Sequence, residues 1–362
     1  MYSLLSSDIE VRIDMFHHAK EAFGLFLYYD MDMNTHLSCI ETAHRISRLK
    51  PWLHFHDLDF FELKAYGQES IYVSILGHAK NTYGICFYFG NKAFNELLYL
   101  VENPELPNLQ KARYQDALVV YYDKKEELTS EDLKLIETVD IKLSRTQRFP
   151  VLRAVHKNYP RSLTEDEVAQ LDAVLILFEK ALLRYNEKKP FVDFEFDEFL
   201  SFRENKNGVW SLRVREVDFD AFDYPEPKFD FFEVRNINPR RFGQQIEIDA
   251  LLLDALIDHD AQTPYLVRAL LIMGVEDAHV FKYQILDPNA DITQTYVEAF
   301  IDFVEEYGRP EAIIVRDYEA ANALDQMAAM IQTPLAVFSE LVNIDDFNEN
   351  IEAFNQVNTR FN

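Results

Sequence analysis

The last hundred residues alternate strand-like and helix-like segments, and this order constrains the fold more than any other feature of the chain. From Pro264, two apolar runs of strand length are separated by a turn at 276–277. A helix, a strand at 312–316, a second helix, a strand at 334–339 and a final helix follow. Such alternation is typical of a partly parallel sheet with helices on its faces. The sequence therefore predicts an α/β domain over residues 264–362.

Residues 1–188 predict a mixed α+β domain. Two apolar strands flank a turn near Lys80, which is the pattern of a β-hairpin. Thr164 and Glu167 match a capping box at the start of a long helix. The short polar stretch 186–190 follows that helix, and we take it as the boundary of the domain.

Residues 189–263 combine acidic and aromatic side chains, and we expect them to form an acidic, β-rich connector that adds strands to the C-terminal domain. Asn207–Gly208 is a strong signal for a hairpin turn. In the run before it, Phe194 and Phe196 alternate with acids, so they are predicted to face a core while the acids face water. An exposed groove for a partner is the alternative use of these aromatic residues, but core packing is commoner.

Charge and composition disfavour several classes of protein. The net charge is −26, and residues 264–362 contain 5 basic and 17 acidic side chains. Such a surface repels phosphate backbones, so nucleic-acid binding is not expected. No glycine-rich phosphate loop is present. The first twenty residues do not match a signal peptide, and no apolar run approaches the roughly 20 residues of a membrane span. We expect a soluble cytoplasmic protein without a membrane segment.

Two resemblances follow from particular motifs. The stretch RPEAIIVRD, 309–317, places Asp317 at the end of an apolar strand that follows a helix and a proline. This order resembles the ribonuclease H-like core of integrases and transposases. Most of the chain also resembles uncharacterised two-domain proteins of Gram-positive bacteria, on the patterns WLHFHDLDFF, IYVSILG, GICFYFG and GRPEAIIVRD. The modules of those proteins are domains of unknown function, so this second resemblance implies a fold and no activity.

The ribonuclease H-like resemblance implies a site in which carboxylates converge on divalent metal ions. In that superfamily one acid lies on the first strand, one at the end of the fourth strand and one on a late helix. Asp317 matches the second position, whereas the first predicted strand, 265–275, contains no acid. The last helix offers several acids for the third position: Asp345, Asp346, Glu349 and Glu352. We therefore expect a degenerate, non-catalytic domain in which Asp317 caps the next helix.

His54 and His56 form a second candidate metal pair, predicted to lie on one face of a strand with Asp57 and Asp59 on the other. A usable site needs a third ligand, and three histidines remain open for that role: His36, His44 and His78. We favour the structural interpretation, in which these side chains are half-buried beside aromatic residues. A Ser–His–Asp triad also stays open because triads are defined by geometry, although no G-x-S-x-G motif is present.

Taken together, these patterns favour a non-enzymatic cytoplasmic protein that acts through a protein partner or self-association and needs no cofactor. The alternative is a metal-dependent hydrolase or nuclease of ribonuclease H-like type. Its divalent metal would be held by Asp317 or by His54 and His56.

Overall fold

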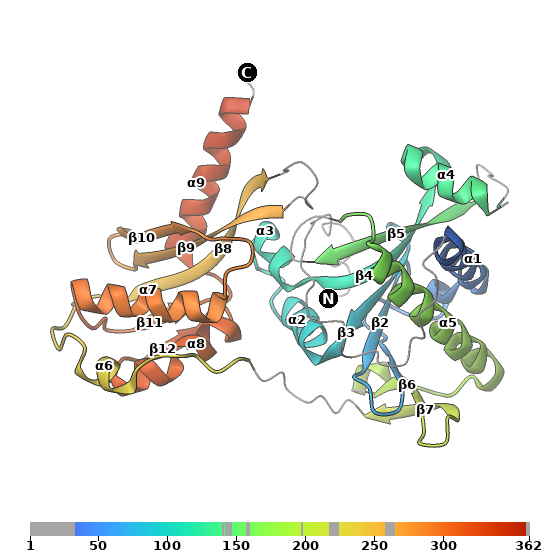
Figure 1. The fold of residues 1–362 in the computed structure, drawn as a ribbon, viewed down its shortest axis with the longest axis horizontal. Helices are drawn as coiled ribbons and strands as arrows, with labels where there is room; N and C mark the ends of the chain where they lie inside the picture. Colours follow the sequence, from blue (N-terminus) through green and yellow to red (C-terminus); the bar gives the residue numbers. More distant parts are fainter. Residues whose placement is uncertain are drawn as a thin grey trace. The chain divides into compact units, whose positions relative to one another are not determined.

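The computed structural model describes residues 33–139, 141, 147–156, 160–196, 198–216, 224–257 and 265–359. The chain divides into two compact units (Figure 1). Unit 1 consists of Met1–Tyr99 and Tyr114–Phe222, and unit 2 consists of Leu100–Arg113 and Asp223–Asn362. Each unit contains helices and a β-sheet, so the predicted mixed α/β fold class is confirmed.

Unit 1 contains a seven-stranded sheet with the order β5-β4-β3-β2-β1-β6-β7. The pair β1–β6 is parallel and the other neighbouring pairs are antiparallel. The predicted hairpin around Lys80 is confirmed as β2 and β3. The strands are β1 Phe61–Lys64, β2 Ile71–Leu76, β3 Gly84–Phe89, β4 Asp116–Lys124, β5 Arg148–His156, β6 Glu198–Glu204 and β7 Trp210–Glu216.

Two helices of unit 1, α1 Met33–Leu49 and α5 Glu165–Lys188, pack their apolar stripes against one face of this sheet and form its main core. The capping box at Thr164 and Glu167 is confirmed. On the other face, Phe94 of α2 stacks on Tyr72 of β2 with 3.9 Å between ring centroids. The remaining elements are η1 Pro51–Leu53, α2 Gly90–Glu102, η3 Lys125–Glu127, α4 Ser130–Thr138 and η4 Phe194–Phe196.

The predicted connector 189–263 is not one element. Its hairpin, β6–β7, forms with the expected turn at Asn207–Gly208, but β6 pairs with β1 and so belongs to unit 1. The first aromatic run is a 3₁₀ turn, η4, rather than a strand. Residues 246–257 form β8 in the sheet of unit 2. The strands of this stretch are therefore divided between the two sheets, with β6 and β7 extending the sheet of unit 1 beyond β1 and β8 at the centre of the sheet of unit 2.

Unit 2 contains a five-stranded sheet with the order β10-β9-β8-β11-β12. Strand β9 is antiparallel to both of its neighbours, β8 and β10, while β11 runs parallel to β8 and β12 runs parallel to β11. The predicted hairpin with a turn near 276–277 is confirmed as β9 and β10. The strands are β8 Ile246–Ile257, β9 Tyr265–Gly274, β10 Val280–Ile285, β11 Ile313–Val315 and β12 Leu335–Val337.

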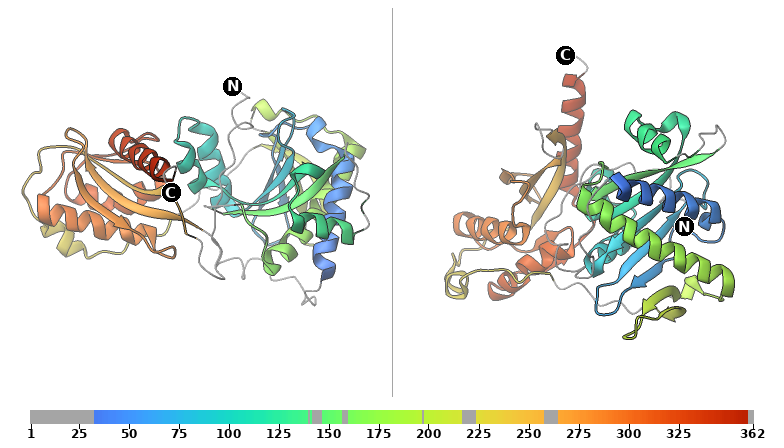
Figure 2. Two further views of the ribbon diagram at one scale, coloured as in Figure 1. Left: turned by 90° about the horizontal axis from the view of Figure 1, so that it is seen from above. Right: turned by 45° about the vertical axis from the view of Figure 1, so that its right-hand side comes forward.

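Helices cover both faces of the unit 2 sheet (Figure 2). The helices α7 Ile292–Tyr307 and α8 Tyr318–Met330 pack against one face, and the first turns of α9 Val342–Thr359 pack against the other. The shorter elements of the unit are α3 Asn108–Lys111, η2 Ala112–Tyr114, which ends in unit 1, and α6 Phe231–Asn236. Within the described ranges, no helix has the length and apolar character needed to cross a membrane.

Candidate functional site

The candidate site lies in unit 2, where the central strand β8 extends beyond its neighbour β11. Strand β11 pairs only with Ile246–Ile248, so the backbone groups farther along this edge of β8 need other partners. Side chains supply them. Ala250 N–H donates to the Tyr296 hydroxyl at 2.9 Å, and the Ala250 carbonyl accepts from Arg268 Nε at 2.7 Å. Beyond the end of β11, polar side chains therefore make the hydrogen bonds that a neighbouring strand would otherwise make to β8.

Asp249 lies on β8 directly after the residues that pair with β11, and it is fully buried. Its two carboxylate oxygens accept from different arginines: Oδ1 from Arg113 Nη1 at 2.6 Å, and Oδ2 from Arg316 Nε at 2.6 Å. Both guanidinium groups are themselves buried. A charge without water around it is stable only when it is paired and hydrogen-bonded, and Asp249 satisfies both conditions.

Asp317 joins the same network from the end of β11. Its Oδ2 accepts from Arg113 Nη2 at 2.7 Å, so a single guanidinium bridges Asp249 and Asp317. Its Oδ1 accepts from Ala320 N–H at 2.9 Å in the first turn of α8. The carboxylate therefore is the helix cap predicted from the sequence and, in addition, one half of a buried ion pair.

Arg316 connects the network to the start of α9. Its Nη2 lies 2.5 Å from Asp345 Oδ1, and its Nη1 donates to the Ser339 carbonyl at 2.6 Å. Asp345 also accepts from Leu341 N–H, which fixes its carboxylate in the first turn of α9. Three aspartates and two arginines from β8, the end of β11, α9 and the segment 100–113 thus form one connected group.

The electrostatics of the group are dominated by the two guanidinium charges. Burial by itself would raise the pKa of Asp249, but the charges of Arg113 and Arg316 outweigh it and lower that pKa to about 2. The effect on the neighbouring Tyr296 is the opposite, since burial and the charge of Asp249 both raise the pKa of its hydroxyl. At neutral pH the group therefore contains ionised Asp249 beside a neutral phenol.

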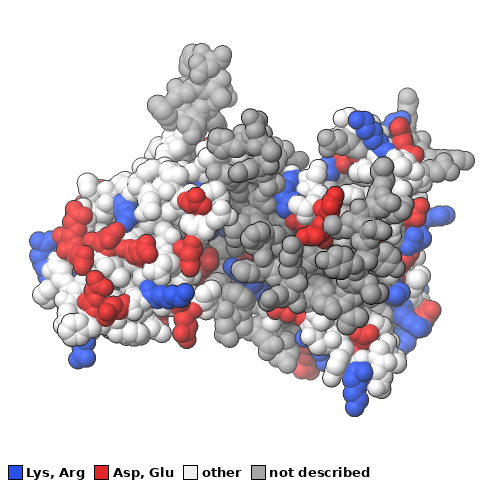
Figure 3. All heavy atoms as spheres, viewed as in Figure 1, with Lys and Arg blue, Asp and Glu red and all other residues white. Residues whose placement is uncertain are grey.

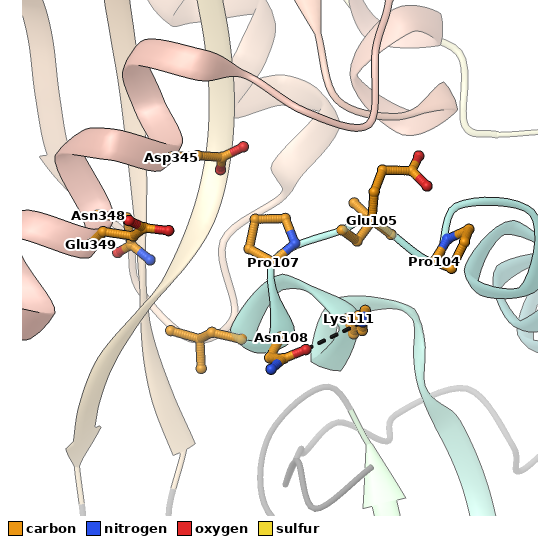
Figure 4. Close-up of a pocket in the computed structure, with 10 residues that line it drawn as sticks. Pro104, Glu105, Pro107, Asn108, Lys111, Asp345, Asn348 and Glu349 are labelled. Atoms are coloured by element: carbon orange, nitrogen blue, oxygen red, sulfur yellow. Dashed lines mark hydrogen bonds between the residues drawn. The ribbon is translucent and has the colours of Figure 1, made fainter. Parts of the chain in front are cut away.

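A pocket of about 470 Å³ lies beside the group, between the segment 100–113 and α9 (Figure 4). Glu105, Pro107 and Lys111 line it on one side, and Asp345 and Glu349 line it on the other. The pocket gives solvent an approach to Asp345, whose side chain is 18% exposed, while Asp249 stays buried.

The histidine candidates lie in unit 1 and only partly meet the prediction. His54 and His56 follow η1 in a loop, so the predicted strand at this position is wrong. The structure brings His56 together with His78, with 3.7 Å between ring centroids, while the His54 ring lies near Phe55. His36 and His44 are on α1.

Asp57 and Asp59 accompany the histidine pair, and burial raises the pKa of each carboxyl group. Asp59 accepts from the His56 backbone N–H at 2.7 Å, which stabilises the loop. Across the part of the chain that the structure describes, no group of three or more His, Cys, Asp or Glu side chains is placed to hold a metal ion. Near Asp249, the carboxylates are instead turned toward guanidinium groups.

Sequence reasoning missed the two residues at the centre of the site. The expectation that the first strand lacks an acid is wrong, because the first strand of the unit 2 sheet is β8, and it carries Asp249. The alternation of apolar and acidic residues in IEID, 246–249, followed by the apolar run 250–253, could have indicated this strand. Arg113 has no comparable signal, since it is one basic residue in a short helical turn.

Comparisons with known proteins identify two domains of unknown function in the chain. Residues 37–202 match the model of Domain of unknown function (DUF7309), and residues 234–352 match Domain of unknown function (DUF6930). No curated protein and no solved structure matched the chain. The first match includes 100–113, the stretch that packs in unit 2 and supplies Arg113 to the site. The two matches support a chain of two domains of unknown function, in agreement with its two compact units.

Proposed function

We propose that this is a non-enzymatic bacterial protein that acts in the cytoplasm through protein contacts, and that its second module is a degenerate ribonuclease H-like domain. The sheet order β10-β9-β8-β11-β12, with three antiparallel strands followed by two parallel ones, supports this relationship. So do the positions of the acids, with Asp249 on the first strand, Asp317 after the fourth strand and Asp345 on the last helix.

The observation that carries the non-enzymatic proposal is that arginine side chains and a backbone N–H already bind Asp249 and Asp317. Arg113 and Arg316 bind both oxygens of Asp249, and Asp317 is bound by Arg113 and by the backbone of α8. A hard divalent cation needs several oxygen ligands free to turn toward it. A guanidinium already placed between two carboxylates competes for those ligands with its charge and with directed hydrogen bonds.

The surface of unit 2 supports contacts with protein rather than with nucleic acid. Acidic side chains outnumber basic ones on the part of unit 2 that Figure 3 shows. Helix α7 contributes exposed Glu298, Asp302, Glu305 and Glu306. Such a field raises the rate of encounter with a basic protein surface and opposes the approach of a phosphate backbone. The two buried free cysteines, Cys39 and Cys86, fit a reducing compartment.

A second function is favoured by one feature, the meeting of three carboxylates from β8, β11 and α9 in one place. Two-metal phosphoryl chemistry requires such convergence. In this alternative the protein is a metal-dependent hydrolase or nuclease, and the arginines occupy its carboxylates only in the resting state.

One experiment separates the two functions. The full-length chain is melted with Mg²⁺, Mn²⁺ or Zn²⁺, and it is assayed with Mn²⁺ on single-stranded and double-stranded nucleic acids. We expect the melting temperature to change by less than about 1 °C, because a ligand shifts it only by binding the native state. We also expect no hydrolysis. Hydrolysis that disappears in Asp249→Asn and persists in Asp254→Asn, an exposed carboxylate on the same strand, would establish the hydrolase instead.

The proposed role in protein contacts is tested by a separate measurement. Light scattering over a range of protein concentrations reports self-association, and quantitative affinity purification from the native host reports a stoichiometric partner. A chain that stays monomeric and recovers no partner in stoichiometric amount would count against a role in protein contacts.

A further inference from the structure

The segment Leu100–Arg113 is a separate piece of unit 2. The chain enters unit 2 at Leu100 and returns to unit 1 at Tyr114, and the rest of unit 2 begins only at Asp223. Within the segment the regular structure after α2 consists of the four-residue helix α3 and the start of η2. The segment therefore begins in the last turn of α2 and joins unit 2 through contacts with β8, with Asp317 and with Ser339.

Two side chains on one helical turn make the contacts with β8. Gln110 and Arg113 are three residues apart, a spacing that places side chains on the same side of a helical turn. The Gln110 side chain accepts from Leu252 N–H at 2.9 Å and donates to the Leu252 carbonyl at 2.8 Å. It thereby completes the edge of β8 as a neighbouring strand would. Arg113 then bridges Asp249 and Asp317.

The groups that receive these side chains match the geometry of an arginine and an amide. We define the seat as the carboxylates of Asp249 and Asp317 together with the backbone N–H and carbonyl of Leu252. The two carboxylates accept from two different nitrogens of one guanidinium, at 2.6 and 2.7 Å. A planar guanidinium offers such paired donors at a fixed spacing, whereas an ammonium group is a single point charge.

In the part of the segment that follows α2, fully buried apolar side chains are few. Its buried side chains after α2 are two apolar and two polar ones: Leu106, Ala112, Gln110 and Arg113. The pocket of about 470 Å³ lies along the side of the segment that faces α9, so this side is incompletely packed (Figure 4). A ligand that reproduced the contacts of Gln110 and Arg113 would replace the hydrogen bonds and ion pairs that join the segment to β8 and Asp317.

We propose that the seat is a peptide-binding site for a partner that presents an arginine on a helical turn, and that Leu100–Arg113 is its resident intramolecular ligand. This inference rests on the proposed function in protein contacts and names the chemistry of one such contact. The partner supplies a guanidinium to Asp249 and Asp317 and, three residues earlier, an amide side chain to Leu252. Binding of the partner releases the segment 100–113 from unit 2.

The test uses the full-length chain with its resident ligand weakened. In the double variant Gln110→Ala/Arg113→Ala the seat keeps all of its own groups but loses the side chains that fill it. The probe is a fluorescent peptide of residues 104–114, with a second peptide carrying Arg113→Ala and a third carrying Arg113→Lys as matched controls. Anisotropy measures binding, and thermal melts with the peptide or with ethylguanidinium measure stabilisation.

We expect the native peptide to bind the double variant at least about tenfold more tightly than either control peptide, since hydrogen bonds to charged groups are lost in both. It should also bind the wild-type chain more weakly than the double variant, because the resident segment competes. Peptide and ethylguanidinium should each raise the melting temperature of the double variant by several degrees.

Equal binding of the three peptides, or no stabilisation by peptide and ethylguanidinium, would overturn the inference while leaving the proposed function intact. Stabilisation of the double variant by Mn²⁺ or Mg²⁺ in place of the peptide would overturn it too and would favour the hydrolase. If the double variant does not fold, Arg113→Lys keeps the positive charge in the seat. The native peptide must then bind Arg113→Lys more tightly than wild type, and failure to do so contradicts the inference.

Discussion

Each unit buries a carboxylate within its sheet, but the two are neutralised in different ways. In unit 1, Glu62 of β1 pairs with Arg203 of the adjacent strand β6 and accepts from the hydroxyls of Ser70 and Ser201. In unit 2, Asp249 of β8 pairs with Arg316 at the end of β11 and with Arg113 from a segment far away in the chain. Glu62 therefore stabilises a strand pair, whereas Asp249 connects separate parts of a unit.

The arginines that pair with these carboxylates differ in exposure, and this difference should change how much each ion pair contributes to stability. The Arg203 side chain is 32% exposed, while Arg113 and Arg316 are 4% and 0% exposed. A buried charge that loses its partner is destabilising, because water cannot replace the lost hydrogen bonds. A partly exposed guanidinium can turn toward water and recover some of them. The same removal of a carboxylate should therefore destabilise unit 2 more than unit 1.

The largest expected effect is that of Asp249→Asn, which leaves two buried guanidinium groups without their shared anion. We expect a loss of about 3–5 kcal/mol in the free energy of unfolding of unit 2. Hydrogen exchange of peptides from β8 measures this loss locally, which matters because a chain with two compact units need not unfold in a single transition. Asp254→Asn on the same strand is the matched control, since its exposed side chain should change stability by less than about 0.5 kcal/mol. Equal effects of the two variants would show that the network does not stabilise unit 2.

Asp317 should show the next largest effect, and here the structure changes the expectation. As a helix cap alone, Asp317→Asn would be nearly neutral, because Asn caps about as well as Asp. The ion pair with Arg113 adds a loss of about 2 kcal/mol, since the amide removes one charge of a buried pair. Asp317→Ala should lose about 1 kcal/mol more, because it also removes the cap. Chemical denaturation of the two variants, followed by a probe in α8, gives both numbers, and an Asn variant as stable as wild type would reduce Asp317 to a cap.

Glu62→Gln removes the corresponding buried charge in unit 1, and its effect on stability can be compared with that of Asp249→Asn in unit 2. We expect a loss of about 1.5 kcal/mol, because the glutamine oxygen can still accept from a serine hydroxyl and Arg203 is partly exposed. Exchange of peptides from β1 measures it, with the exposed Glu216→Gln of the same sheet as control. If Glu62→Gln destabilised unit 1 as strongly as Asp249→Asn destabilises unit 2, arginine exposure would not explain the difference between the units.

The smallest expected effect is a difference in pH dependence. Burial raises the pKa of Asp123 in unit 1 from 3.8 to about 6, with Glu127 adding to the shift. The folded state therefore binds this proton before the unfolded chain does. The contribution to stability is fully present below pH 3.8 and is lost as the pH rises through about 6. We expect unit 1 to gain about 1 kcal/mol between pH 7 and pH 5.

The contribution of Asp249 to stability depends on pH in the opposite direction. Its pKa is lowered to about 2, so its contribution to unit 2 is present above pH 3.8 and is lost only as the pH falls through about 2. Hydrogen exchange of peptides from β4 and β8, measured at several pH values and corrected for intrinsic exchange, separates the two. Asp123→Asn should abolish the gain in unit 1 without affecting unit 2. A gain that persists in this variant would assign the effect to another group.

The elements that could be predicted from the sequence depend on residues close together in the chain. The hairpins of β2–β3, β6–β7 and β9–β10, the capping box at Thr164 and the cap at Asp317 were all predictable. Turns and caps are local, because a backbone group finds its partner within a few residues. The alternating pattern after Pro264 likewise indicated a sheet covered by helices.

The sheet that each strand joins, and the assembly of the site, were decided by the tertiary structure alone. Hairpin β6–β7 pairs with β1 in unit 1, while β8 becomes the central strand of unit 2, although both lie in one acidic stretch of sequence. Arg113 is separated from Asp249 by 136 positions and from Asp317 by 204. The sequence shows that Arg113 is charged, but it does not show which residues Arg113 contacts. Its partners are determined by the fold, which buries Arg113 between β8 and the end of β11. A charge buried in this position is stable only with an opposite charge within hydrogen-bonding distance, and Asp249 and Asp317 supply it.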